Sequence, residues 1–218
     1  MQLSITIILV IITALVSISG FSSQKIIDDL IFYPPAVSRR GQWYRFFSSG
    51  LIHADYGHLI FNMLALYLFG RSVEDAFVEL FGDTGRYIYL GMYVSALLVS
   101  LLPTYFRNKD SYQYRSLGAS GAVSAVIFAG LMLSPGTEVY LFFVPIPIPG
   151  FIFAPLYLLV SFYLDRRGRD NINHSAHIWG SIYGLVFVIF VSRLVGYNAI
   201  EAAIEHIKFY MKLKGWTH

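Results

Sequence analysis

Long apolar segments alternate with shorter polar connections along the whole chain. A helix that crosses the hydrocarbon core of a bilayer needs about 20 mostly apolar residues. The pattern predicts six transmembrane helices joined in series, in an all-α integral membrane bundle. Their approximate ranges are 3–21, 57–70, 86–106, 117–134, 150–164 and 175–195.

Several features set the expected ends of these helices. No basic residues precede the first apolar run, so we interpret it as a retained helix rather than a signal peptide. Pro103 is expected to help end the third helix, because proline lacks a backbone N–H. The stretch with Pro145, Pro147 and Pro149 is interpreted as a loop before the fifth helix.

Two further segments are apolar without being predicted spans. Residues 22–56 are too rich in Ile, Phe, Tyr and Trp for a solvated linker, so we expect a long first loop in the membrane interface. Beyond it, a C-terminal helix is predicted to carry apolar and charged residues on opposite sides: Ile200, Ile204, Ile207 and Met211 against Glu201, Glu205, Lys208 and Lys212. This pattern is typical of an amphipathic helix on a membrane surface, or of one packed on the bundle. The chain is therefore divided into a membrane domain at 1–197 and an amphipathic tail at 198–218.

Composition strengthens the membrane interpretation and excludes several kinds of chemistry. Of the 218 residues, 56% are hydrophobic and 13% charged, whereas a soluble domain is about one quarter charged. The chain has no cysteine, which excludes disulfides, thiolate nucleophiles, Fe–S clusters and cysteine zinc sites. The net charge of +3 is scattered, and no basic stripe indicates nucleic-acid binding.

Polar residues inside predicted spans are the strongest functional signal, because such groups usually face the bundle interior. Ser120 lies about one turn into the fourth predicted helix, between Gly118 and Gly121. It could be a nucleophile. Alternatively, the small residues Gly121, Ala125 and Ala129 allow a close helix contact, and the serine hydroxyl bonds its own helix.

His177 lies at a similar depth in the sixth helix and is followed by Gly180 and Gly184. These glycines would let the sixth helix press against the fourth, which starts on the same side of the membrane. An imidazole there could take the proton of Ser120 and return it to a leaving group. The alternative is a histidine that only bonds two helices together. No acidic residue is close in sequence, so the predicted unit is a dyad.

His58 and Asn62 are spaced i, i+4 and share one face of the second helix. Both can donate hydrogen bonds, as an oxyanion hole requires, or they could form a polar clasp between helices. His53 and His58 raise the question of metal. The His-Glu-x-x-His pattern of zinc proteases is absent, so no metal and no cofactor are predicted.

Taken in chain order over about residues 41–190, these motifs resemble the rhomboid family of intramembrane serine proteases. The matching pieces are Tyr44-Arg45-Phe46-Phe47, His53 with His58 and Asn62-Met63, Phe69-Gly70-Arg71-Ser72-Val73-Glu74, Gly118-x-Ser120-Gly121, and Ala176-His177-x-x-Gly180-x-x-x-Gly184.

The resemblance implies roles for these residues. Ser120 would be the nucleophile and His177 the general base and acid, while His58, Asn62 and the Ser120 N–H would hold the oxyanion. The supporting residues would be Gly118, Gly121, Gly180 and Gly184 around the site, with Arg45 fixing the first loop and Glu74 the end of the second helix. The fifth helix and the loop at 165–175 would gate access. Substrates would be membrane proteins with a single helix, cleaved in or near the bilayer without a cofactor.

The chain departs from the family pattern at two positions. Tyr44 rather than tryptophan precedes Arg45, and Ser124 occupies a position where an aromatic residue often stacks on the catalytic histidine. An inactive rhomboid-fold protein that binds membrane helices is therefore one alternative, and a small transporter another, although no inverted repeat is visible. The loops that the family places outside the cytoplasm carry most of the Lys and Arg, the reverse of the usual bias. We expect a bacterial-type plasma membrane and keep the family orientation, with the site facing the extracytoplasmic side.

Overall fold

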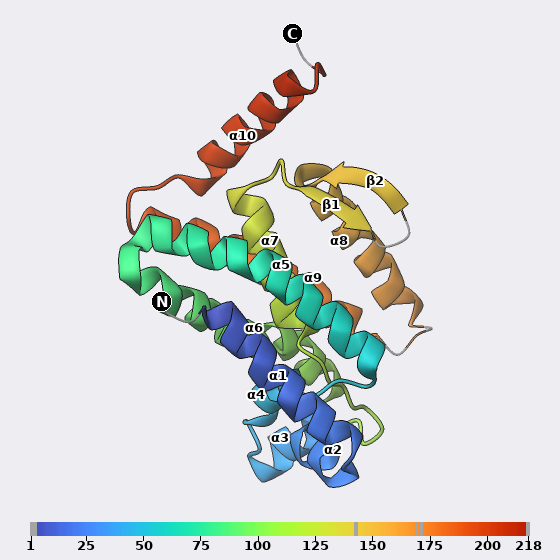
Figure 1. Cartoon of the computed structure of the whole chain (residues 1–218). Helices are drawn as coiled ribbons and strands as arrows, with labels where there is room; N and C mark the ends of the chain where they lie inside the picture. The colour runs from blue at the N-terminus through green and yellow to red at the C-terminus, as the bar shows by residue number, and fades with distance from the viewer. Residues whose placement is uncertain (1–3, 142–143, 169, 171, 217–218) are drawn as a thin grey trace.

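The computed structural model describes residues 4–141, 144–168, 170 and 172–216, and it is mainly helical. The bundle contains the α-helices α1 (Ile5–Phe21), α5 (Tyr56–Phe81), α6 (Gly85–Asn108), α7 (Ser120–Leu133), α8 (Gly150–Arg167) and α9 (His174–Arg193). Helix α7 lies at the centre, with its apolar side chains buried against α5, α6 and α9 (Figure 1). The all-helical prediction is confirmed for the bundle.

Two helical stretches of the described chain are long and apolar enough to cross a membrane. One is Tyr56–Asn108, which holds α5, a 3-10 turn η2 (Gly82–Thr84) and α6. The other is His174–Arg193, which is α9. Helices α1 and α7 are apolar as well but shorter.

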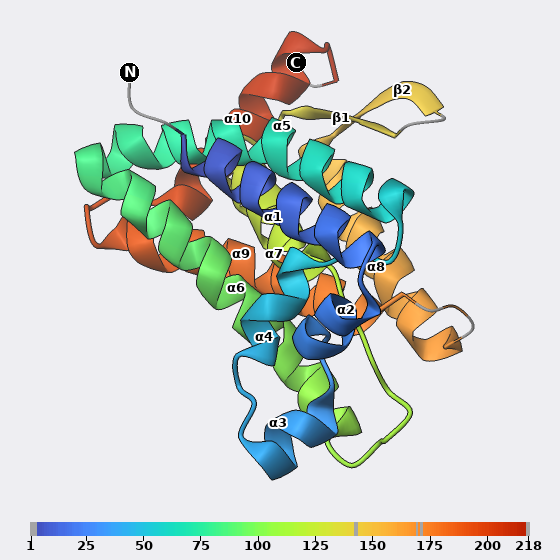
Figure 2. The same ribbon diagram turned by 60° about the horizontal axis from the view of Figure 1, so that its bottom comes forward.

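The first loop folds into short helices at one end of the bundle, on the side where α1 ends and α5 begins. They are α2 (Gln24–Leu30), α3 (Pro34–Arg40), α4 (Arg45–Ser48) and the 3-10 turn η1 (Ser49–Leu51). Figure 2 shows them gathered together at this end, beside the chain that links α6 to α7.

Arg45 is buried within this first loop and holds it in shape. Its guanidinium donates to the backbone carbonyls of Asp28 (2.9 Å) and Ile31 (2.7 Å), and to the side-chain oxygen of Gln42 (2.6 Å). A buried charge needs such partners, because leaving it unpaired is costly. These contacts join the start of α4 to the end of α2.

Glu74, near the end of α5, binds the start of α1. Its carboxylate accepts hydrogen bonds from the backbone N–H groups of Ile5 (2.8 Å) and Thr6 (3.0 Å), and from the hydroxyls of Ser4 and Thr6. The first N–H groups of a helix lack partners within it, and negative charge there is favourable. Glu74 therefore ties α5 to α1.

Two predictions that involve proline were wrong. Helix α6 continues through Pro103 to Asn108, so the expectation that this proline ends the helix was wrong. One proline removes one backbone N–H, and a packed apolar helix keeps its remaining bonds. Residues Val144–Pro149 form strand β2, antiparallel to β1 (Glu138–Leu141), so the loop predicted there was also wrong.

Helix α10 (Ala199–Leu213) stands outside the bundle, next to this hairpin (Figure 1). Ala199 and Ala203 face the bundle, whereas the predicted apolar stripe leaves Ile200 and Ile204 exposed. The Nζ atom of Lys214, just after α10, lies 2.9 Å from Glu138 Oε1 in β1. This hydrogen bond holds the pKa of the Glu138 carboxyl below its usual value and joins the end of α10 to the hairpin.

Candidate functional site

Ser120 is the first residue of α7, and the glycine before it explains why the helix starts there. Gly118 has φ = +112°, a conformation that side chains strongly disfavour and that cannot continue a helix. A Cβ atom on Gly118 would also come within 2.7 Å of His58. The prediction of Ser120 one turn inside the helix was therefore wrong: it lies at the helix start, where the N–H groups have no helical partner.

Helices α7 and α9 are in backbone contact through small residues. A Cβ atom on Gly180 would overlap the carbonyl oxygen of Gly121, and one on Gly184 would overlap that of Ala125. Close helix contacts of this kind require glycine in the pressed helix. Gly121 in turn faces Ser100 of α6 with no space for a side chain. The predicted contact between the fourth and sixth helices is present.

The α7–α9 contact brings the two candidate reactive residues together. His177 Nε2 lies 2.8 Å from Ser120 Oγ, within ordinary hydrogen-bond distance. In the part of the chain that the structure describes, no carboxylate is bonded to His177. The 2.8 Å separation allows the serine hydroxyl to donate to the imidazole, and nucleophile activation requires this geometry.

His58 and Asn62 of α5 face the same space. Together with Ser120 and His177 they line a cavity of about 520 Å³. The Asn62 amide donates one hydrogen bond to the carbonyl of His58 (3.0 Å), and no other described residue accepts from it. Donors and nucleophile therefore face one space, as an oxyanion site requires.

His53 supports this arrangement from behind, a role that sequence reasoning did not assign. Its Nε2 accepts a hydrogen bond from the N–H of Ala119 (3.4 Å), so Nδ1 carries the proton and lies 2.9 Å from Ser17 Oγ of α1. Burial lowers the pKa of His53 to about 3, which keeps the ring neutral and able to accept. His53 thus connects α1 to the turn before Ser120.

Three further contacts next to the dyad were missed. The ring of His174 meets that of His177 edge-on, with centroids 5.9 Å apart, and His174 Nε2 lies 3.0 Å from Asp170. The hydrogen bond to His174 holds the pKa of the Asp170 carboxyl below its usual value. Ser124 is directed to α8, where its hydroxyl lies 3.3 Å from the Tyr157 hydroxyl. The i, i+3 spacing of the two histidines could have indicated the first contact.

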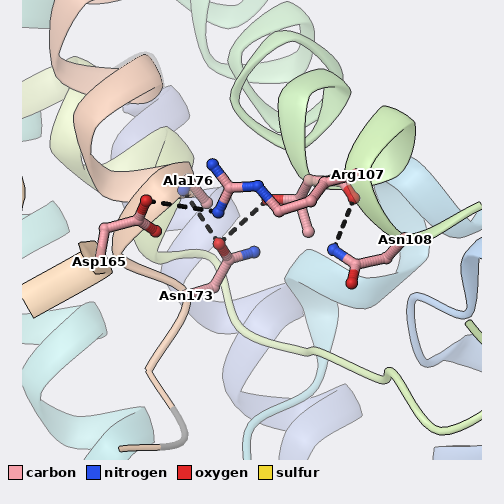
Figure 3. A network of polar contacts seen from close by, with 6 residues as sticks. Arg107, Asn108, Asp165, Asn173 and Ala176 are labelled. Atoms are coloured by element: carbon pink, nitrogen blue, oxygen red, sulfur yellow. Dashed lines mark hydrogen bonds and ion pairs between the residues drawn. The ribbon is translucent and has the colours of Figure 1, made fainter. Parts of the chain in front are cut away.

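A polar network joins the start of α9 to α6 (Figure 3). The side-chain oxygen of Asn173 accepts from the Thr104 hydroxyl (3.0 Å) and from the Ala176 N–H (3.1 Å), so Asn173 caps α9. Beside it, Arg107 of α6 lies 3.3 Å from Asp165 of α8. The two Asn173 hydrogen bonds fix the first turn of α9, which carries His177.

The described residues contain no group of three or more His, Cys, Asp or Glu side chains placed to hold a metal ion.

Comparison with known proteins gives consistent matches. The sequence model of the Rhomboid domain matches residues 40–194. RHOMBOID-like protein 12, mitochondrial, of Arabidopsis thaliana is 29% identical over 66% of this chain and 45% of that protein. Rhomboid protease GlpG of Pectobacterium atrosepticum is 28% identical over 85% of this chain and 60% of that protein. Rhomboid protease AarA of Providencia stuartii is 26% identical over 70% and 57%. The chain thus spans about half the length of the curated relatives it matches.

Proposed function

Because the chain belongs to the rhomboid family, we propose that it is an intramembrane serine protease with Ser120 as nucleophile and His177 as general base and acid. The observation that carries the proposal is the 2.8 Å contact between Ser120 Oγ and His177 Nε2 in the wall of a cavity. The relatives named as rhomboid proteases support the same reaction class.

The chemistry follows from the positions of these groups. Ser120 Oγ attacks the substrate carbonyl carbon while His177 Nε2 takes the hydroxyl proton. Negative charge then develops on the carbonyl oxygen, and the donors of His58, Asn62 and the Ser120 N–H stabilise it. His177 returns the proton to the leaving amine, and a water molecule releases the acyl group by the same steps in reverse order.

The membrane arrangement completes the proposal. Helices α1, α5, α6, α7, α8 and α9 would be six spans, with α2 to α4 in the interface and residues 198–218 as a separate tail. The dyad lies at helix starts, close to one surface, where water can enter. Helix α8 and the loop at 165–175 would admit a single-span substrate. The substrate helix must unwind before its carbonyls can react, so Gly, Pro or polar residues near the bond should favour cleavage.

Localisation is proposed only as far as an integral membrane protein with the site on the extracytoplasmic side. Relatives with mitochondrial, chloroplastic and bacterial names all match. A bacterial-type plasma membrane therefore stays a prediction from the sequence. Separation of the membranes of the source cell, with immunodetection of the chain, tests it.

The decisive experiment compares the purified chain with Ser120→Ala on a panel of single-span substrates. We expect cleavage near the membrane by wild type and a loss of at least about 10³-fold in the variant. Ser72→Ala, a serine on the exposed side of α5, serves as the matched control and should cleave like wild type. Equal cleavage by Ser120→Ala would refute this nucleophile. Substrate binding without cleavage by folded wild type would instead favour the helix-binding alternative, for which Ser124 in place of an aromatic residue is the observation.

A further inference from the structure

Arg115 lies in the wall of the same cavity as Ser120 and His177, on the segment that leads into α7. Its side chain is exposed, and its guanidinium carbon lies 4.9 Å from the centre of the Tyr33 ring. The backbone beside it is fixed, because Ser116 and Phe32 exchange hydrogen bonds of 3.1 and 3.0 Å. The charge is therefore held at the cavity rather than on a free loop.

Three other arginines at this end of the bundle use their donors within the protein. Arg39 contacts Asp110 and the Tyr112 hydroxyl, Arg107 contacts Asp165, and Arg45 is buried among carbonyls. For Arg115, the recorded partner in the described residues is the Tyr33 ring alone. Stacking on a ring face positions a guanidinium and leaves its N–H donors available.

The second charged residue in the cavity wall is Asp55, the N-cap of α5. Its carboxylate already accepts the N–H of His58 at 2.8 Å. The cavity thus carries a positive group on the α7 side and a negative group on the α5 side. An anionic group of a bound chain would be attracted to the first and repelled by the second.

We propose that Arg115 forms a subsite for a carboxylate side chain of the substrate, so that the enzyme prefers an Asp or Glu near the cleaved bond. This proposal rests on the proposed protease function and names part of its substrate class. Arg115 is five residues from Ser120, and an extended chain spans roughly 3.3 Å per residue. We therefore expect the carboxylate within about five residues of the bond that reacts.

The test uses the full-length protein in neutral detergent with single-span substrates that differ at one position. An Asp is moved from five residues before to five residues after the cleaved bond, and each substrate has an Asn counterpart. We expect Asp to raise kcat/KM about tenfold over Asn at one or two neighbouring positions, because charge-assisted hydrogen bonds are strong. Arg115→Gln should bring this ratio to about one, and Arg115→Glu should bring it below one, because like charges repel.

Arg40→Gln is the matched control, because Arg40 is exposed at the same end but is not part of the cavity wall. It should keep the wild-type ratio. A ratio of about one at every position in wild type, or a ratio that Arg115→Gln leaves unchanged, would overturn the proposal even if Ser120-dependent cleavage is intact. Binding of the protein to phosphatidylglycerol vesicles is measured as well. If this binding depends on Arg115 while the Asp and Asn substrates are cleaved equally, Arg115 binds a headgroup phosphate and the proposal is overturned.

A second readout separates this proposal from the protease function. Fluorescence anisotropy measures binding of the Asp and Asn substrates to Ser120→Ala, which needs no cleavage. Tighter binding of the Asp substrate, lost in the Ser120→Ala, Arg115→Gln double variant, would support the subsite even if wild type hydrolyses nothing. Equal binding of both substrates would overturn it.

Discussion

Helices α8 and α9 are consecutive in the chain, but α9 is packed tightly against the bundle and α8 loosely. Helix α9 meets α7 through backbone atoms at Gly180 and Gly184, where a single added carbon would overlap its neighbour. Helix α8 buries only Gly150 and Ser161 among its described residues and exposes large side chains such as Leu159 and Tyr163. Its polar contacts to α6 and α7 are the Arg107–Asp165 pair and the Tyr157–Ser124 hydrogen bond.

The difference shows that the tightest packing lies between α7 and α9. The residues of the dyad lie on the two helices that cannot shift relative to each other without a clash, so their separation is fixed by the backbone. Helix α8 contributes neither member of the dyad, and none of its described residues lines their cavity. It buries few of its residues, and the proposed gate would use this loose packing.

The largest effect is expected from Gly180→Ala, which breaks the tight contact. The new Cβ would collide with the Gly121 carbonyl oxygen, so the helices must separate. We expect a loss of about 3 kcal/mol in unfolding free energy and a large loss of cleavage. Thermal unfolding in detergent measures the first. Gly91→Ala is the control, because no atom lies within 4 Å of the added carbon. A Gly180→Ala variant as stable as wild type would contradict the packing described.

The free energy of unfolding is expected to depend on pH through His53, which bonds the turn before α7. Folded His53 has a pKa of about 3, against an ordinary value of 6.5. Between these values the unfolded chain binds a proton that the folded chain does not. Stability is therefore fully present above pH 6.5 and falls as the pH is lowered, by up to about 1.4 kcal/mol per unit.

Unfolding temperatures of wild type and His53→Gln between pH 7.5 and 5 measure this contribution. The variant should be less stable at pH 7.5 and should lose less stability on acidification. His58, whose ring lies 4.9 Å from that of His53, is present in both proteins. Parallel curves would show that His53 does not contribute.

A smaller effect is expected at the first turn of α9. His174→Ala removes the edge-on ring that contacts His177, and such ring pairs contribute about 0.5–1.5 kcal/mol. We expect kcat to fall about three- to tenfold with little change in KM, because the ring positions His177 and does not touch substrate. His174→Phe should restore much of the loss. An unchanged kcat in His174→Ala would remove this residue from the positioning of the dyad.

The smallest effect on stability is expected at the edge of α8. Asp165→Asn breaks an ion pair whose Arg107 side chain is 60% exposed, and such pairs contribute less than about 1 kcal/mol. If α8 moves to admit substrate, kcat/KM should rise about twofold while the unfolding temperature barely changes. The same increase should appear in wild type at high salt, because salt screens the pair. A fall in kcat/KM with unchanged stability would argue against α8 as the gate.

The main helices and the closeness of Ser120 to His177 could be predicted from hydrophobic periodicity and glycine spacing. Ser120 and His177 stand out as polar residues in apolar helices, and Gly180 and Gly184 indicate which helix can approach which. The start of α7 was not predictable, since it depends on a positive φ at Gly118 that composition does not reveal.

The contacts around the dyad required the fold itself. Ser17 and His53 are joined only because α1 packs beside η1, and Tyr157 reaches Ser124 only through the packing of α8 on α7. Asp170 is close to His174 in sequence, but the importance of this pair depends on the direction of the first turn of α9. Arg115 enters the cavity wall through a loop pairing with Phe32 that no pattern predicts.

The hairpin before α8 has a consequence for association between molecules. Strand β2 is paired with β1 along one edge, and prolines occupy every second position at 145, 147 and 149. Because N–H groups of a strand point alternately to its two sides, proline removes the donors from the side that does not bond β1. In a bilayer, unpaired donors at an open edge would be costly and would invite a strand from another copy. Pro147 and Pro149 remove donors from that edge, which lowers its tendency to pair with a strand of another copy.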